Sequence, residues 1–176
     1  LHSFPTRRSS DLGVPVGGYE YAVSGRLDIT DTKTTGGAAS KIELQIAKNV
    51  QNFVKFHLFR YPTNNSLYAY PTVNGKALTQ VICEKNTMPK GTSYKAEYIF
   101  VYDGQEIKLY FKDGSYLPDY KLVYTQEAKW GYTMFTLAMR QYCNVTFDNF
   151  KTYYGDDFDA LVNSLETATS DVEFSA

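Results

Sequence analysis

Carboxylate side chains are the first residues to test for catalysis, and their spacing gives little support for it. Two acids at a spacing of two share one face of a β-strand, and glycoside hydrolysis needs two carboxylates that face one cleft. The pairs with this spacing are Asp157/Asp159 and Asp171/Glu173, both after Gly155. No sequence feature predicts a pair assembled from different strands. We therefore expect no enzyme, and keep a glycoside hydrolase relative with displaced carboxylates as an alternative.

Histidine and cysteine are equally sparse. His57 lies between Phe56 and Leu58, and alternation directs its side chain away from the apolar face of its strand. It is either an exposed strand residue or a hydrogen-bonding group on a binding face. A metal ligand is the weakest interpretation, because no suitably placed cysteine accompanies it and the other histidine, His2, lies among the first twelve residues, which resemble a translated sequencing adapter. Cys83 and Cys143 are too few for a disulfide-rich scaffold or a four-cysteine zinc site, and their pairing stays open.

Carbohydrate binding requires less of a sequence than catalysis. Sugar rings stack their C–H faces on aromatic side chains, and their hydroxyls hydrogen-bond to amide, carboxylate and guanidinium groups. The aromatic candidates, in or beside turns or on segments of mixed polarity, are Trp130, Tyr132, Tyr61, Tyr68 and Tyr70. The polar candidates, on strand faces opposite the core, are Arg140, His57, Lys55, Gln45 and Glu43. The alternative for each aromatic residue is a place in the core or in a cross-strand pair.

The elements that must position these residues are short segments with a period of two. The ten strands that we expect are 19–30, 41–47, 53–60, 66–73, 78–85, 94–102, 106–112, 120–125, 132–140 and 144–154. Turn residues separate them, and Asp103-Gly104 is the strongest hairpin signal. No segment before residue 156 has helical periodicity. The sequence therefore predicts an all-β fold, an antiparallel β-sandwich of about ten strands.

Two irregularities interrupt the alternation. Gly25 lies within an apolar strand pattern, where we expect a bend or a bulge. The apolar parity also shifts between Phe147 and Phe150, which predicts a bulge beside Asp148.

Composition excludes several classes of protein. The chain has 176 residues, of which 43% are hydrophobic, and a formal net charge of -1. This profile is typical of a globular domain and not of a disordered tail. A near-neutral charge argues against nucleic acid or an anionic membrane as a partner. No apolar run approaches the ~20 residues that span a bilayer, so we expect no membrane insertion.

The two ends of the chain differ from the middle. Residues 1–12, LHSFPTRRSSDL, resemble a translated sequencing adapter, so we expect an artefact of a metagenomic assembly there and a true N-terminus outside this sequence. Residues 13–155 form the expected β-sandwich domain. Residues 156–176 are acidic and predict either a short helix, with Asp156 as its N-cap, or a linker, which we favour.

Three stretches, in this order, resemble the concanavalin A-like lectin/glucanase superfamily, and its laminin-G-like bacterial modules in particular. The opening stretch is Ser24–Ile29 leading to Ile42–Ile46, the second is the hairpin from Tyr94 to Gly114, and the last is Val145–Tyr153 with its Phe-Asp-Asn-Phe core. The resemblance covers about residues 17–154. It implies a jelly roll of two antiparallel sheets. It departs from the hydrolases of that group, because their Glu-x-Asp-x-x-Glu strand is missing.

The resemblance also implies a function. We expect a non-catalytic carbohydrate-binding module, with a glycan or polysaccharide as its partner, in a larger extracellular or cell-surface bacterial protein with neighbouring domains. A structural or adhesive spacer without a small ligand is the main alternative. In this superfamily an aspartate of the last strand often helps to hold a structural calcium ion. Asp148 matches that position, and Glu20 or Asp28 would join it.

Overall fold

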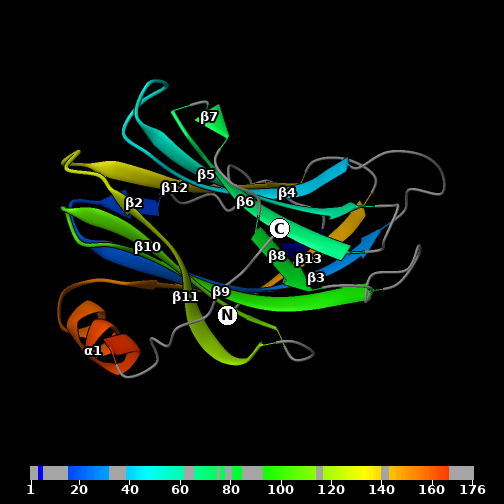
Figure 1. Cartoon of the computed structure of the whole chain (residues 1–176). Coiled ribbons are helices and arrows are strands. Elements are labelled where there is room, and N and C mark those ends of the chain that lie inside the picture. Colours follow the sequence, from blue (N-terminus) through cyan, green and yellow to red (C-terminus); the bar gives the residue numbers. More distant parts are fainter. Residues whose placement is uncertain are drawn as a thin grey trace.

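The protein is a sandwich of two antiparallel β-sheets with one helix (Figure 1). The computed structural model describes residues 4–5, 16–31, 39–61, 66–74, 76–77, 81–84, 93–113, 117–139 and 143–166. Within these residues the chain passes repeatedly from one sheet to the other, as in a jelly roll, and every strand pairing is antiparallel. The predicted fold class is confirmed.

Each sheet has a central group of long strands. Sheet A runs in the order β1 (Phe4–Pro5), β13 (Cys143–Tyr153), β3 (Tyr21–Asp31), β9 (Ser93–Tyr102), β10 (Glu106–Asp113) and β11 (Leu117–Glu127). Sheet B runs in the order β2 (Val16–Gly18), β12 (Thr133–Met139), β4 (Ala39–Ala47), β5 (Phe53–Tyr61), β6 (Ser66–Val73) and β7 (Lys76–Ala77), and β8 (Val81–Glu84) also pairs with β6.

All ten predicted strands correspond to observed strands, with boundaries that differ by a few residues. The strands that the pattern missed, β1, β2 and β7, have only two or three residues each, too few for a period of two to be visible. β1 lies within the segment that resembles an adapter, and its Phe4 pairs with Phe147 of β13.

The core lies between the sheets and is rich in aromatic residues. Phe135 of β12 is its centre, because its ring contacts rings from two strands of the opposite sheet. The ring centroids lie 6.3 Å from Tyr98, 5.8 Å from Phe100 and 6.0 Å from Phe150. Contacts of this kind hold the two sheets together beyond the effect of area burial alone.

The two predicted irregularities have different outcomes. The bulge beside Asp148 is confirmed, since the β13–β3 register shifts between Asp148 and Lys151 and Asn149 has a φ of 53°. Gly25 itself is not an extra residue in its strand, because the β3–β9 register is continuous through it. The bulge lies opposite Gly25, on β13, between the partners of Arg26 and Ser24. Gly25 instead makes room for Tyr98: a Cβ there would lie 2.5 Å from the Tyr98 hydroxyl.

Helix α1 (Gly155–Glu166) packs on the outer face of sheet A. Its buried residues Phe158 and Leu165 contact a second apolar cluster, which includes Ala22, Ile99 and Val101. The helix alternative of the prediction is therefore confirmed for these residues. Asp156 is not the N-cap, because the helix begins at Gly155. With Asp157 it lies in the first turn, where an acidic side chain favours the helix dipole.

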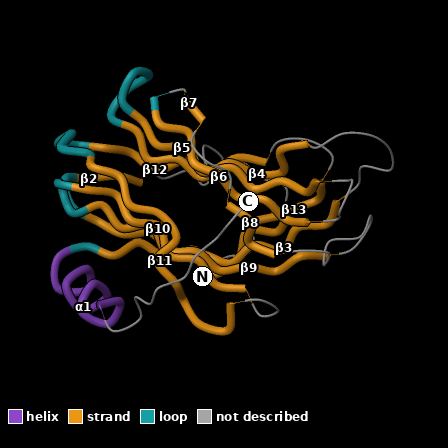
Figure 2. Tube along the Cα trace, viewed as in Figure 1, coloured by secondary structure: helices purple, strands orange, loops and turns teal. Residues whose placement is uncertain are grey.

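The described turns gather at one end of the sandwich, the end at which α1 begins (Figure 2). The predicted β9–β10 hairpin lies there, and Gly104 has a φ of 85° in its turn. The Asp103 carboxylate accepts hydrogen bonds from the backbone N–H groups of Gln105 and Glu106, both at 2.8 Å. Within the described residues, no helix is long and apolar enough to cross a membrane.

Candidate functional site

The outer face of sheet B, the face turned away from the core, carries most of the predicted polar residues. Along β12, β4 and β5 the buried residues alternate with residues on this outer face. Five polar side chains from the three strands form what we call the polar row: Glu43, Gln45, Lys55, His57 and Thr136. Their positions follow from the register, which pairs Thr136 with Gln45, Gln45 with Lys55, and Glu43 with His57.

Glu43 connects the charged members of the polar row. One carboxylate oxygen, Oε2, lies 3.5 Å from Lys55 Nζ, and the other, Oε1, lies 3.5 Å from His57 Nδ1. The side chains of His57 and Glu43 are only 13% and 12% exposed. The interpretation of His57 as an exposed strand residue is therefore wrong. It lies on a central strand, flanked by β4 and β6, so neighbouring residues shield it from solvent.

A shallow hollow adjoins the polar row where β4 turns into β5. Its volume is about 360 Å³, and its lining residues are Gln45, Ala47, Asn49, Val50, Phe53 and Lys55. The Lys55 ammonium lies 5.7 Å from the centroid of the Phe53 ring. The Gln45 amide Nε2 reaches Thr136 Oγ1 at 3.5 Å, a long contact that holds the amide weakly. An aromatic ring, an amide and an ammonium group therefore surround one small space.

Phe53 and Thr136 are the members of this site that the sequence analysis missed. Phe53 has the same parity as Lys55 and His57, so it belongs to the outer face although it is apolar. Thr136 is similarly placed between the buried Phe135 and Leu137. Parity alone could have identified both residues. Their proximity to Gln45 and Glu43 depends on which strands are neighbours, which parity does not give.

For four predicted residues the structure describes either the backbone alone or no atoms. The register pairs Tyr70 with His57 and Tyr68 with Phe59, and Tyr61 lies at the far end of β5, roughly 27 Å along the strand from Phe53. The side chains of Tyr61, Tyr68 and Tyr70 are outside the described residues, as is all of Arg140. Their roles in binding stay predictions.

The two remaining aromatic candidates lie in the loop before β12 and differ from each other. Tyr132 is 48% exposed and makes an edge-to-face contact with Tyr19, which is 70% exposed, at 5.4 Å. Trp130 instead packs against the main core. Its backbone N–H donates to the Tyr102 hydroxyl at 3.2 Å, and that hydroxyl donates to the Gly131 carbonyl at 2.9 Å. Burial raises the pKa of Tyr102.

Asp148 and Glu20 do not fit a shared calcium site. Asp148 pairs in register with Arg26, whereas Glu20 precedes β3, six residues from Arg26 and roughly 20 Å along the strand. Asp28, the other candidate partner, lies 3.9 Å from Lys95 Nζ. Calcium needs six to eight oxygen ligands. Among the described residues, no group of three His, Cys, Asp or Glu side chains could hold a metal ion.

Several solved structures share this fold at low sequence identity. A functionally unknown protein from Saccharomyces cerevisiae has a TM-score of 0.55 at 9% identity, over 81% of this chain and 74% of that one. The lectin I from Ulex europaeus, in complex with the methyl glycoside of alpha-L-fucose, has a TM-score of 0.51 at 9% identity, over 78% and 71%. The chain spans 27% of a xylan beta-1,4-xylosidase from Bacillus halodurans, with 76% of this chain matched at a TM-score of 0.50 and 14% identity. No family model and no curated protein matches the sequence.

Proposed function

We propose that the outer face of sheet B binds a glycan without changing it chemically. The observation that carries this proposal is the hollow beside Phe53 and its continuation into the polar row. The Phe53 ring offers an apolar surface to a sugar face, and the Gln45 amide, Lys55 ammonium and Glu43 carboxylate offer donors and acceptors to its hydroxyls. The sandwich fold shared with a lectin supports the proposal.

The arrangement of Glu43 favours binding over hydrolysis. Its two carboxylate oxygens face Lys55 and His57, whereas a glycosidase needs a second carboxylate across a cleft. Along β12, β4 and β5, Glu43 is the one carboxylate on this face. The hollow is a further argument for a binding module over a spacer domain. The resemblance of the sequence supports a place in a larger extracellular bacterial protein with neighbouring domains.

Affinity electrophoresis of the full chain through gels of soluble xylan, glucan, mannan or pectin tests this proposal. We expect one glycan to retard the protein, and Phe53→Ala and Lys55→Ala to weaken retardation by about tenfold in affinity. Lys108→Ala is the matched control, because Lys108 is 35% exposed and lies 3.4 Å from Glu106 on the other sheet, much as Lys55 is 30% exposed and 3.5 Å from Glu43.

Equal mobility in all gels, from a protein with an intact unfolding transition, would favour the spacer. Release of reducing sugar from the retarding glycan would favour the hydrolase. Melting temperatures measured in calcium and in excess chelator address the ion separately, since a calcium site near Asp148 predicts a higher melting temperature in calcium.

A further inference from the structure

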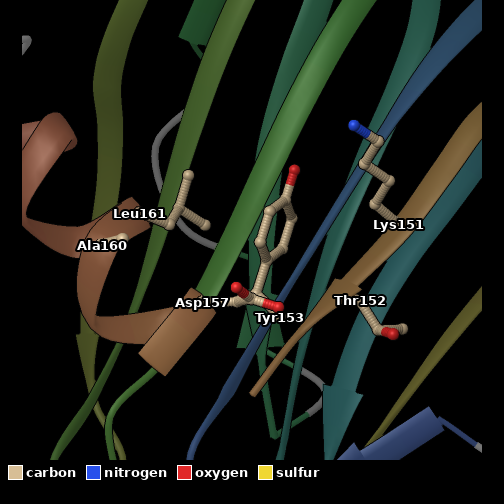
Figure 3. A pocket seen from close by; sticks show the side chains of 6 residues that line it. All are labelled: Lys151, Thr152, Tyr153, Asp157, Ala160 and Leu161. Atoms are coloured by element: carbon tan, nitrogen blue, oxygen red, sulfur yellow. The ribbon is translucent and has the colours of Figure 1, made fainter. Parts of the chain in front are cut away.

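The outer face of sheet A carries a second hollow, beside helix α1. It has a volume of about 520 Å³ and is lined by Lys151, Thr152 and Tyr153 of β13 and by Asp157, Ala160 and Leu161 of α1. Figure 3 shows Tyr153 projecting from β13 between Leu161 on the helix and Lys151 on the strand. The α1 side of the hollow is partly apolar, and the β13 side carries charge and hydroxyl groups.

The hollow continues past Tyr153 over the middle of the sheet. An adjoining space of about 310 Å³ shares Lys151 and Tyr153 with the first and is also lined by Ser24, Gly25, Glu97, Tyr120 and Asn149. We call the two spaces together the β13–α1 groove. Its residues come from β3, β9, β11, β13 and α1, and none of them belongs to the polar row.

Hydroxyl groups are concentrated in this groove. Ser24 Oγ and the Tyr153 hydroxyl lie 2.9 Å apart, and Tyr120 hydrogen-bonds to the Glu97 carboxylate. Burial, and then the charge of Glu97, raise the pKa of Tyr120, so its phenol stays protonated at neutral pH. Glu97 is also 3.7 Å from Lys112 Nζ. The middle of the groove therefore has hydroxyl groups that are already oriented by their neighbours.

Two complementary charges border the groove and are available to a ligand. Lys151 and Asp157 are exposed, and no ion pair within the described residues engages either of them. A phosphate ligand would need several cations. Lys151 is the one cation among the lining residues, and the neighbouring cations Lys112 and Arg26 both lie beside Glu97, Lys112 at 3.7 Å and Arg26 as its partner in register. An apolar ligand would take water away from Lys151, Asp157 and the amide of Asn149 without offering them a partner, which is costly.

We propose that the β13–α1 groove is a second binding site, on the opposite face of the sandwich from the polar row, for a saccharide of one to three rings. A saccharide offers vicinal hydroxyls that both donate and accept, which suits Lys151, Asp157, Ser24 and Tyr153 together. Its C–H faces can lie against the apolar groups of Tyr153 and Leu161. Two sites on opposite faces would allow one domain to bridge two polysaccharide chains.

Nuclear magnetic resonance of the ¹⁵N-labelled full chain tests this proposal. The probes are cellotriose, xylotriose, mannotriose and trigalacturonic acid, each titrated separately. We expect saturable shifts of the amide signals of Lys151, Tyr153, Asp157 and Leu161 with at least one probe. Lys151→Ala and Asp157→Ala should each raise the Kd of that probe by about tenfold.

The controls separate this site from a general surface effect and from the polar row. Lys95→Ala and Asp159→Ala remove exposed charges on the same sheet face and the same helix, outside the groove lining, and should leave the Kd unchanged. Shifts confined to Gln45, Phe53 and Lys55 would overturn the second site and leave the proposed function standing. Shifts confined to the groove would support the second site and contradict the first. No shift of the groove signals with any probe would overturn this proposal.

Discussion

The outer faces of the two sheets differ in the side chains that they carry and in what covers them. On sheet B, residues turned away from the core include a polar row in which Glu43 meets Lys55 and His57. On sheet A, the corresponding positions include an apolar cluster with Ile99 and Val101, which α1 covers. Antiparallel sheets can leave one face to solvent, and here only sheet A is covered by a helix of the described chain.

This difference bears on the two binding sites that we propose. Covering an apolar strip with a helix stabilises sheet A, but it leaves an edge at which helix and strands meet, and the β13–α1 groove lies along that edge. No helix of the described chain packs on the outer face of sheet B, and its outward side chains on β4 and β5 instead contact one another, as Glu43 does with Lys55 and His57.

The largest expected effect is at the core that both faces share. Phe135→Ala removes a ring that contacts Tyr98, Phe100 and Phe150 across the sheets. We expect the free energy of unfolding to fall by about 3–5 kcal/mol, measured by urea denaturation. Phe53→Ala, the same exchange on the outer face of sheet B, should cost under about 1.5 kcal/mol. Equal losses would mean that Phe53 is a core residue and not part of a binding face.

The second largest effect concerns helix α1, which covers the apolar cluster on the outer face of sheet A. Phe158 of α1 is 4% exposed and packs in the apolar cluster of that face. Phe158→Ala should lower the stability of α1 by about 2–3 kcal/mol, seen as faster amide hydrogen exchange in the helix than in β4 and β5. Asn163→Ala, at an exposed position of the same helix, is the control and should have little effect. Equal acceleration in α1 and in β4 and β5 would show that the helix is not a separate cover.

The strands were largely predictable because a half-buried strand has a visible period of two. The alternation around Ile42, Leu44 and Ile46 gave both the strand and its inward face, and all three residues are fully buried. The role of Gly25 was not predictable. It depends on Tyr98 being its partner in register across β3 and β9, and a single sequence does not contain that pairing.

Most residues of the polar row could be predicted from the sequence, but which of the candidates lie close together could not. Parity placed Glu43, Gln45 and His57 on one face, and the structure brings them together. Trp130 was grouped with them because it lies beside a turn, but its loop is tied to Tyr102 and the residue packs against the core. The contact of a loop with a distant strand has no local sequence signal. The apolar cluster under α1 was not predictable either. The outward apolar residues of β9 only interrupt the alternation of polar and apolar residues, and nothing in the sequence pairs them with the helix.

Alkaline pH is the third test, because the described tyrosines with raised pKa values all belong to sheet A. Burial raises the pKa of Tyr98 and Tyr21 above their ordinary value and that of Tyr124 to about 12. Unfolded tyrosines ionise first, near pH 10, so stability is full below that pH and falls as pH rises toward the folded values. We expect a loss of about 1.4 kcal/mol per pH unit for each fully buried tyrosine. Tyr98→Phe should flatten this decline in urea denaturation above about pH 10, and a slope unchanged by that exchange would contradict the assignment.

The smallest expected effect compares one ion pair from each face. Lys55 and Glu43 on sheet B are 30% and 12% exposed at 3.5 Å, whereas Lys95 and Asp28 on sheet A are 61% and 36% exposed at 3.9 Å. Solvent screens the second pair more strongly, so double-mutant cycles should give a coupling of about 0.5–1 kcal/mol for Lys55–Glu43 and under about 0.3 kcal/mol for Lys95–Asp28. Salt should abolish the weaker coupling first. If the two couplings were equal, the polar row would be an ordinary solvated surface, and the contrast between the two faces would rest on the helix alone.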